Sequence, residues 1–129
     1  MASKIDSVIL ILLLVAMSFI FQVQLKIFAN EVAPALTGGA SSFTERAAFV
    51  AKAAMGWRPL LIIALAGGLF VVWLLTLSRL ELSVALPLAS IALVVNSVGA
   101  GLLLGETLSW MRLVGILTVA AGLMLVLRS

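Results

Sequence analysis

The feature that most constrains this chain is a stretch of 21 residues, Val84 to Leu104, that contains no charged side chain. A helix of this length is roughly 30 Å long, which is the thickness of the hydrocarbon core of a bilayer. After the short polar turn Gly105-Glu106-Thr107, a second apolar segment continues to Leu125. The sequence therefore predicts a membrane hairpin, and we expect the rest of the chain to be organised around it.

Composition places the rest of the chain in the membrane as well. Of its 129 residues, 64% are hydrophobic and 10% are charged, and the mean hydropathy is +1.34. These values are far too apolar for a soluble domain of this size and predict an all-α membrane protein. A formal net charge of +3 from so few charges disfavours nucleic-acid binding and favours contacts between loop cations and membrane lipids.

The chain lacks the side chains on which most catalytic and metal sites depend. It has no Cys and no His, which excludes disulfides, thiol chemistry and the commonest metal-ligand clusters. The sequence offers no paired carboxylates, and its few hydroxyl groups have no general base beside them. We therefore expect a protein that is not an enzyme and that holds no metal and no cofactor.

Four apolar segments are long enough to cross a bilayer. Trp57 and Arg58 mark a water boundary before the second segment, and Trp110 and Arg112 do the same before the fourth. Lys4 ahead of an apolar run also fits a signal peptide, but no small-x-small cleavage site follows at once, which favours a retained helix. The predicted spans are residues 7–28, 58–77, 82–104 and 108–127, within a single domain of residues 1–129.

A polar interval separates the first two spans, and we expect Pro34, Gly38 and Gly39 to break regular structure there. Ser42 and Glu45 then form the S-x-x-E pattern of a capping box. Apolar residues share one face of the segment that follows. This pattern predicts a short amphipathic helix over residues 42–55 that lies in the membrane interface. An ordinary connector helix is the alternative.

An even number of spans puts both termini on one side of the membrane. By the positive-inside rule the long loop and the turn at Glu106 are cytoplasmic, and both termini are external. The bias is small, so two opposed orientations in one assembly stay open. Three cations lie on the side of the termini, Lys4, Arg79 and Arg128, and five lie near the other, Lys26, Arg46, Lys52, Arg58 and Arg112.

Polar side chains within the spans or at their ends are the candidate functional residues. Ser18, Gln22 and Lys26 are four residues apart and share one face of the first helix, whereas Gln24 is rotated from Gln22 by about 200°. Lys26 either snorkels to the headgroups or holds a phosphate or another anionic group. Asn96 is an amide deep in the third span, so it should face protein or a cavity. It forms either a structural interhelical hydrogen bond or a contact with substrate.

Small residues and one proline are expected to shape the packing of the helices. Small residues let backbones approach closely where lipid supplies no hydrophobic drive for association. Pro87, one turn inside the third span, is expected to bend that helix because it removes a backbone hydrogen bond. The predicted helix-packing positions are Gly68 in the second span, Ser97, Gly101 and Gly105 in and after the third, and Gly115 and Gly122 in the fourth.

A succession of short motifs runs through the last two spans: Ala85-x-Pro87-x-x-Ser90, Ser97, Gly101, Leu104-Gly105-Glu106-x-Leu108, Gly115-Ile116-Leu117 and Ala121-Gly122-Leu123. This succession resembles the closing helix pair of the EamA-like drug/metabolite transporter superfamily. That superfamily includes four-helix proteins of small-multidrug-resistance size. Within it, Gln22-x-x-x-Lys26 is similar to the first helix of the subunits of the flippase for aminoarabinose-phosphoundecaprenol.

The resemblance to the flippase subunits implies a multi-pass protein of the bacterial inner membrane. It implies transport of an undecaprenyl-phosphate-linked sugar such as aminoarabinose, for lipopolysaccharide modification at lipid A. Such subunits work in pairs, which implies a homodimer or a heterodimer with a paralogous four-helix subunit. On this hypothesis Gln22, Lys26 and Arg58 hold the phosphate or sugar-phosphate, while the polyprenyl tail stays in lipid beside the spans.

Two other functions stay open. Exporters of lipophilic cations of the small-multidrug-resistance type carry an acidic residue in the middle of the first helix, which corresponds to about Ser18 here. Since no interior of a predicted span contains Asp or Glu, neither cation attraction nor proton exchange has an obvious carrier. The third class is a non-transporting membrane adaptor that holds a glycosyltransferase or another partner at the bilayer.

Overall fold

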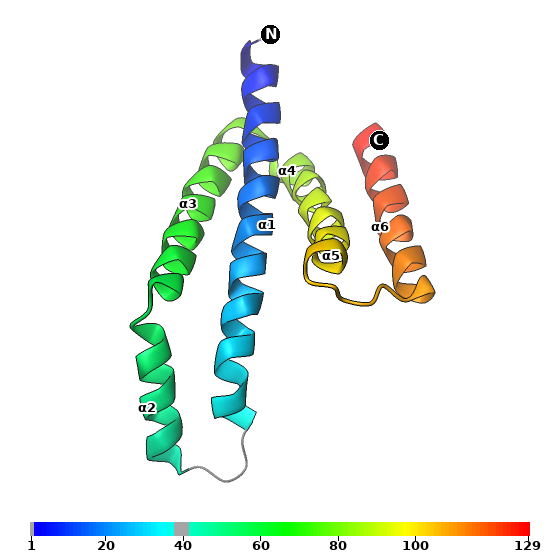
Figure 1. Ribbon diagram of the computed structural model, residues 1–129. Helices are drawn as coiled ribbons and strands as arrows, with labels where there is room; N and C mark the ends of the chain where they lie inside the picture. Colours follow the sequence, from blue (N-terminus) through cyan, green and yellow to red (C-terminus); the bar gives the residue numbers. More distant parts are fainter. Residues whose placement is uncertain (1, 38–41) are drawn as a thin grey trace.

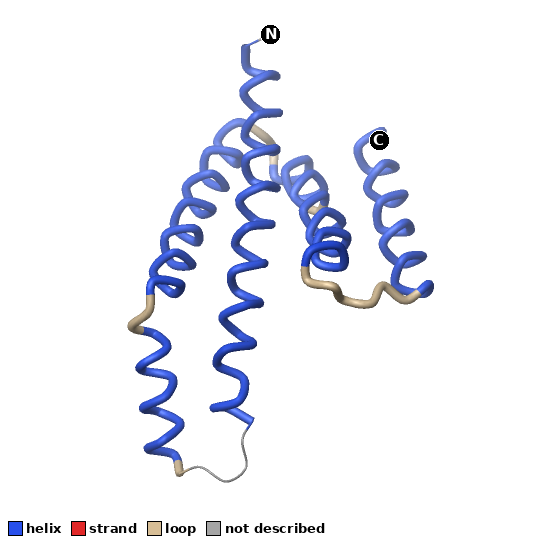
Figure 2. The backbone as a smooth tube through the Cα atoms, viewed as in Figure 1, coloured by secondary structure: helices blue, strands red, loops and turns tan. Residues whose placement is uncertain are grey.

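The computed structural model describes residues 2–37 and 42–129, and this part of the chain folds into helices without a strand (Figures 1 and 2). The all-α class expected from the composition is therefore confirmed. In chain order the helices are α1 (Ala2–Thr37), α2 (Phe43–Ala54), α3 (Trp57–Arg79), α4 (Leu82–Ala89), α5 (Ile91–Leu103) and α6 (Trp110–Arg128).

Four helical segments of the described chain are long and apolar enough to cross a membrane. They are Lys4–Thr37, Trp57–Arg79, Leu82–Leu103 and Trp110–Arg128, which correspond to the four predicted spans. Both termini lie toward the same end of the bundle in Figure 1, as expected for an even number of spans. These features support a multi-pass membrane protein.

Helix α1 is the element around which the other helices are arranged. It contacts α2, α3, α4 and α5, and in Figure 1 it lies between α3 on one side and the α4–α5 segment on the other. Its 36 residues make a helix about 54 Å long, so it offers a packing surface along the whole bundle. The expectation that the hairpin of residues 84–125 organises the fold is therefore wrong. Its second arm, α6, contacts α4 and α5 but not α1 among the described residues.

The third span is interrupted at Ser90, which separates α4 from α5. Pro87 has no backbone N–H to donate to the carbonyl one turn earlier. The N–H of Ser90 donates to the carbonyls of Leu86 and Pro87, each at 3.1 Å, and the Ser90 hydroxyl donates to the Leu86 carbonyl at 3.1 Å. Where a bend is expected from Pro87, the span is thus divided into two helices, and local hydrogen bonds satisfy the carbonyls of Leu86 and Pro87.

Helix α1 continues beyond its predicted end and contains Pro34. The prediction that Pro34 breaks regular structure is therefore wrong, and the same prediction for Gly38 and Gly39 lies outside the described residues. The reason lies in its position near the C-terminus of α1, where a missing N–H removes one hydrogen bond from a helix that has few turns left. The Thr37 hydroxyl donates to the Ala33 carbonyl at 2.8 Å and so satisfies one of the terminal carbonyls.

Helix α2 begins where the capping pattern predicted. Ser42 is its N-cap, and the Ser42 hydroxyl oxygen accepts a hydrogen bond from the backbone N–H of Glu45 at 3.3 Å. In Figure 1, α2 extends beyond α3 and runs beside the end of α1, and α2 contacts both of these helices. The predicted place of this helix in the membrane interface is not confirmed, because this course follows α1 rather than crossing it.

Two glycines predicted to pack lie against side chains, but from different elements. A Cβ added at Gly68 would lie 2.6 Å from the Met17 Cε of α1, so Gly68 lets α3 approach α1. A Cβ at Gly101 would lie 2.6 Å from the Leu108 Cδ1, which belongs to the loop after α5 and not to another helix. The close approach of α5 to α1 occurs at Gly99, where an added Cβ would overlap the ring of Phe19.

The remaining small residues do not pack helices together within one chain. Gly105 has a φ of +65°, so it serves the turn after α5. Added Cβ atoms at Gly115 and Gly122 would have no neighbour within 4 Å, because these glycines face away from α4 and α5. The Ser97 hydroxyl donates to the Leu93 carbonyl of its own helix at 2.7 Å.

Few side chains of the described residues are buried within a single chain. Thr76 of α3 is 1% exposed, and its hydroxyl donates to the Val72 carbonyl at 2.8 Å. Many large apolar side chains are exposed instead, which suits helices whose outer faces meet lipid tails. The buried apolar residues are Leu14, Val32, Val72 and Ala85.

Gly99→Ala is expected to destabilise the bundle, since overlap with the Phe19 ring costs about 1–3 kcal/mol. Gly67→Ala is the matched control because an added Cβ there meets nothing within 4 Å. Both variants gain about 1 kcal/mol of helix propensity. The free energy of unfolding in mixed micelles, followed by helical circular dichroism, measures the difference. Equal stability of the two variants would contradict the packing described at Gly99.

Candidate functional site

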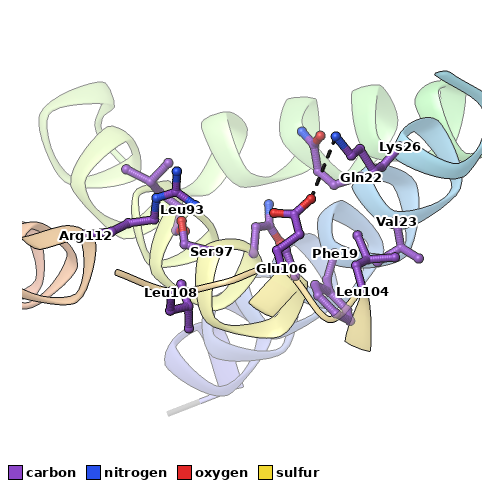
Figure 3. Close-up of a pocket in the computed structure, with 12 residues that line it drawn as sticks. Phe19, Gln22, Val23, Lys26, Leu93, Ser97, Leu104, Glu106, Leu108 and Arg112 are labelled. Carbon is purple, nitrogen blue, oxygen red and sulfur yellow. Dashed lines mark hydrogen bonds and ion pairs between the residues drawn. The ribbon is translucent and has the colours of Figure 1, made fainter. Parts of the chain in front are cut away.

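A pocket of about 450 Å³ lies between α1, α5, the loop that follows α5 and the start of α6 (Figure 3). One part of its wall is apolar and is formed by Phe19, Val23, Leu93, Ala100, Leu104 and Leu108. The other part carries the polar and charged side chains Gln22, Lys26, Asn96, Ser97, Glu106 and Arg112. The pocket thus combines an apolar wall with both positively and negatively charged side chains.

The stripe predicted on α1 faces this pocket. Gln22 and Lys26 both line it, and Ser18, one turn further along the helix, accepts a hydrogen bond from the Asn96 Nδ2 of α5 at 3.1 Å. The prediction that Asn96 faces protein or a cavity is confirmed, since Asn96 bonds to Ser18 and also lines the pocket. This hydrogen bond fixes α5 against α1 at the depth where the pocket begins.

The other end of the Asn96 amide is an unused acceptor. Its Oδ1 is buried and has no hydrogen-bond partner among the described residues. A buried acceptor without a donor costs free energy.

Lys26 and Glu106 form an ion pair across the mouth of the pocket (Figure 3). The Lys26 Nζ lies 3.7 Å from the Glu106 Oε1, and the two side chains are 50% and 40% exposed. Exposed pairs of this kind contribute about 0–1 kcal/mol, so a competing ion can displace either partner. Glu106 reaches the pocket because Gly105, with its positive φ, turns the loop after α5.

Arg112 supplies a second cation to the pocket from the first turn of α6. The Ser109 side chain caps this helix by accepting from the Arg112 backbone N–H at 3.3 Å, and the guanidinium Nη1 donates to the Thr107 carbonyl at 3.5 Å. None of the ion pairs found in residues 2–37 and 42–129 involves Arg112. With two cations and one carboxylate in its lining, the pocket has a formal charge of +1.

Arg58 does not join Gln22 and Lys26, which corrects the grouping predicted from the sequence. It is not among the residues that line the pocket. Its Nη1 donates to the Gln24 Oε1 at 2.9 Å, its Nε lies 3.4 Å from the Glu31 Oε1, and its guanidinium lies 5.0 Å from the Trp57 ring centroid. The physical reason is the rotation of Gln24 away from Gln22, which points the two amides toward different neighbours of α1.

Sequence reasoning missed Glu106 and Arg112 as pocket residues. In the sequence each is a charge at the end of a span, and nothing within its own helix distinguishes it from other charges at span ends. The available signal was the short distance along the chain between them, with a glycine beside Glu106 that turns the loop. That the loop folds back toward α1 is a tertiary feature, and no spacing within α5 or α6 indicates it.

The hydrogen bond between Ser18 and Asn96 should appear as a coupling in a double-mutant cycle. Ser18→Ala, Asn96→Ala and the double variant are compared by their free energies of unfolding in mixed micelles. A coupling of about 0.6 kcal/mol is typical for such bonds between membrane helices. Asn96→Ala combined with Thr118→Ala is the control and should be additive, because Thr118 bonds within α6. Additivity of the Ser18 and Asn96 variants would exclude the interaction.

In chemical terms, the pocket suits a ligand that carries an anionic group and hydrogen-bond donors next to an apolar part. The cations of Lys26 and Arg112 meet the anion, Asn96 and Ser97 meet the donors, and the aliphatic wall meets the apolar part. Searches of family models, of curated proteins and of solved structures found no match to this chain.

Proposed function

We propose that this protein is a subunit of a bacterial inner-membrane transporter that flips a polyprenyl-phosphate-linked sugar, with aminoarabinose on undecaprenyl phosphate as the example. The observation that carries the proposal is the pocket between α1 and α5. It joins a net positive charge, hydrogen-bonding groups and an apolar wall in a chain with four membrane-length helices. The resemblance of the last two spans to EamA-like transporters also favours a transporter.

In this proposal the phosphate binds between Lys26 and Arg112. Both are cations at the same end of the bundle, and charge-assisted hydrogen bonds to phosphate oxygens are roughly twice as strong as neutral ones. Gln22 stands one turn from Lys26 on α1 and adds an amide donor. The phosphate displaces Glu106 from Lys26, and this exchange costs little free energy because the ion pair is exposed to solvent.

The sugar then lies beside Glu106, Asn96 and Ser97. A sugar that carries an amine places a second charge, of opposite sign, next to the phosphate. Glu106, released from Lys26, is a suitable partner for that ammonium group, and the Ser97 hydroxyl oxygen accepts from a sugar hydroxyl. A mixed-charge headgroup therefore explains why the pocket contains a carboxylate as well as two cations.

The polyprenyl tail needs an apolar route beside the helices. An apolar cavity of about 440 Å³ between α5 and α6 supplies such a surface, with Ile91 and Val94 on α5 facing Ala121 and Met124 on α6. Since a single chain buries few of its side chains, we propose that a second four-helix subunit, identical or paralogous, completes the path for the substrate.

A second candidate function follows from Glu106. Exporters of lipophilic cations need a carboxylate in the binding site, and Glu106 lines the pocket. Against this stand the exposure of Glu106 and its pairing with Lys26. A partner cation and contact with water both reduce the attraction of a carboxylate for a second cation.

Transport of a lipid-linked aminosugar should depend on Lys26 and Arg112. Purified protein is reconstituted in vesicles with the substrate, and an impermeant amine reagent reports how much sugar has reached the outer leaflet. Lys26→Ala and Arg112→Ala are each expected to lower the rate about tenfold, because each removes a charge-assisted contact to the phosphate. Lys52→Ala, on the exposed surface of α2, is the matched control. Arg58→Ala should reduce stability more than transport. Unchanged transport rates in both Lys26→Ala and Arg112→Ala would refute the assignment of these two residues to phosphate binding.

Glu106→Gln separates the two candidate functions. If the protein is a flippase, the variant should still bind the phosphate-linked lipid. Its preference for the lipid with an aminosugar over the lipid with a neutral sugar should be weaker than that of the unmodified chain. For the cation exporter, the same variant should abolish binding of tetraphenylphosphonium. Equilibrium binding of both ligands to the two proteins in detergent makes the comparison. We expect no saturable binding of tetraphenylphosphonium to the unmodified chain. If the unmodified chain binds this cation tightly and Glu106→Gln does not, the proposal is reversed in favour of the cation exporter.

A further inference from the structure

A second cavity with cations at its rim lies at the opposite end of the bundle. Its volume is about 650 Å³, and it is formed by α1, the end of α3 with the residue after it, and α4. The residues that line it are Lys4, Ser7, Val8, Ile11, Arg79, Leu80 and Leu88. Neither the sequence patterns nor the proposed function uses this cavity.

The spacing of Lys4 and Lys26 places the two cavities at the two surfaces of a bilayer. Twenty-two positions separate these residues on the uninterrupted helix α1, which corresponds to about 33 Å and to a rotation of about 40° after six full turns. The distance matches the thickness of the hydrocarbon core. The small rotation means that both lysines lie on the same side of α1, which also carries Ser18.

Charge at the second cavity is net positive. Two cations, Lys4 and Arg79, line this cavity. Among the described residues, one carboxylate pairs with them: the Asp6 Oδ2 lies 3.0 Å from the Arg79 Nη1. The Arg79 and Asp6 side chains are 45% and 49% exposed, so the pair is weak and open to competition from another anion. Lys4 takes part in none of the ion pairs found in residues 2–37 and 42–129.

The wall of the cavity is charged near the end of the bundle and becomes apolar toward the membrane interior. Val8 and Ile11 follow Lys4 by four and seven positions on α1, which places them about 6 Å and 10 Å deeper. Leu88 faces them from α4. Cations at the depth of the headgroups above aliphatic side chains at the depth of the acyl chains match the shape of an anionic phospholipid, whereas a free phosphate makes no use of the aliphatic wall.

We propose that Lys4 and Arg79 bind the phosphate of an anionic lipid in the leaflet opposite the pocket of Lys26, with the acyl chains of that lipid against Val8, Ile11 and Leu88. This site is independent of the proposed transport. It accepts any lipid with a net negative phosphate headgroup, and it holds the lipid beside the end of α1 that is remote from Lys26.

Photolabelling of the full chain tests the proposal. The protein is reconstituted in phosphatidylcholine vesicles that contain phosphatidylglycerol with a diazirine near the glycerol backbone, and labelled residues are mapped after pepsin digestion. Labelling of residues 5–11 is expected to fall about fivefold in Lys4→Ala. Lys52→Ala, the matched control, should label like the unmodified chain. Asp6→Asn should increase labelling of residues 5–11, because it frees Arg79, and a variant that merely unfolds would not produce an increase.

The outcomes separate this site from the transport pocket. Lys26→Ala should leave labelling of residues 5–11 unchanged, so failure of one site does not imply failure of the other. Equal labelling in Lys4→Ala and Lys52→Ala, or a decrease in Asp6→Asn, would overturn the proposal. So would equal labelling by a phosphatidylcholine probe. Complete protection by millimolar inorganic phosphate would assign the cations to free phosphate instead of lipid.

Discussion

Lipid offers the peptide backbone no hydrogen bonds, and this constraint governs the whole structure. Every N–H and carbonyl group inside the hydrocarbon core must find its partner within the protein, and a helix achieves this within each segment. The exceptions are informative: Pro87 interrupts the third span, and the Ser90 backbone and hydroxyl bond to the carbonyls near the break. Polar chemistry inside the membrane is then left to side chains.

The charged side chains gather at the two ends of the bundle and tie the long helix α1 to its neighbours. Each ion pair found in the described residues joins α1 to another element: Lys26 to the loop after α5, Glu31 to the start of α3, and Asp6 to the end of α3. Between these ends, Ser18 and Asn96 form a polar contact between α1 and α5. One face of α1 therefore carries cations near both membrane surfaces and a hydrogen bond between them. Such an arrangement suits a protein that handles charged lipid headgroups, as proposed above.

The small amount of buried surface explains why this bundle is not self-sufficient in the way a soluble domain is. Among the described residues helix α6 contacts α4 and α5 but not α1, and a Cβ added at either of its glycines would meet nothing within 4 Å. In a membrane the lipid solvates such faces, since its tails are as apolar as the side chains they meet. In the assembly proposed above, a second subunit replaces that lipid and helps to enclose the substrate.

The sequence by itself determined the class of protein and its helices, because hydrocarbon thickness and backbone hydrogen bonding act on each segment separately. The uncharged run from Val84, the aromatic and basic residues at Trp57 and Trp110, and the cap at Ser42 predicted elements that the structure contains. The shared face of Gln22 and Lys26 also followed from helical periodicity. Only the tertiary structure decided that α1 is central, that Arg58 turns to Gln24 and Glu31, and that Glu106 and Arg112 complete the pocket. These features depend on how a loop folds back and which helices become neighbours, and in lipid no pattern of hydrophobic burial encodes that choice in a single segment.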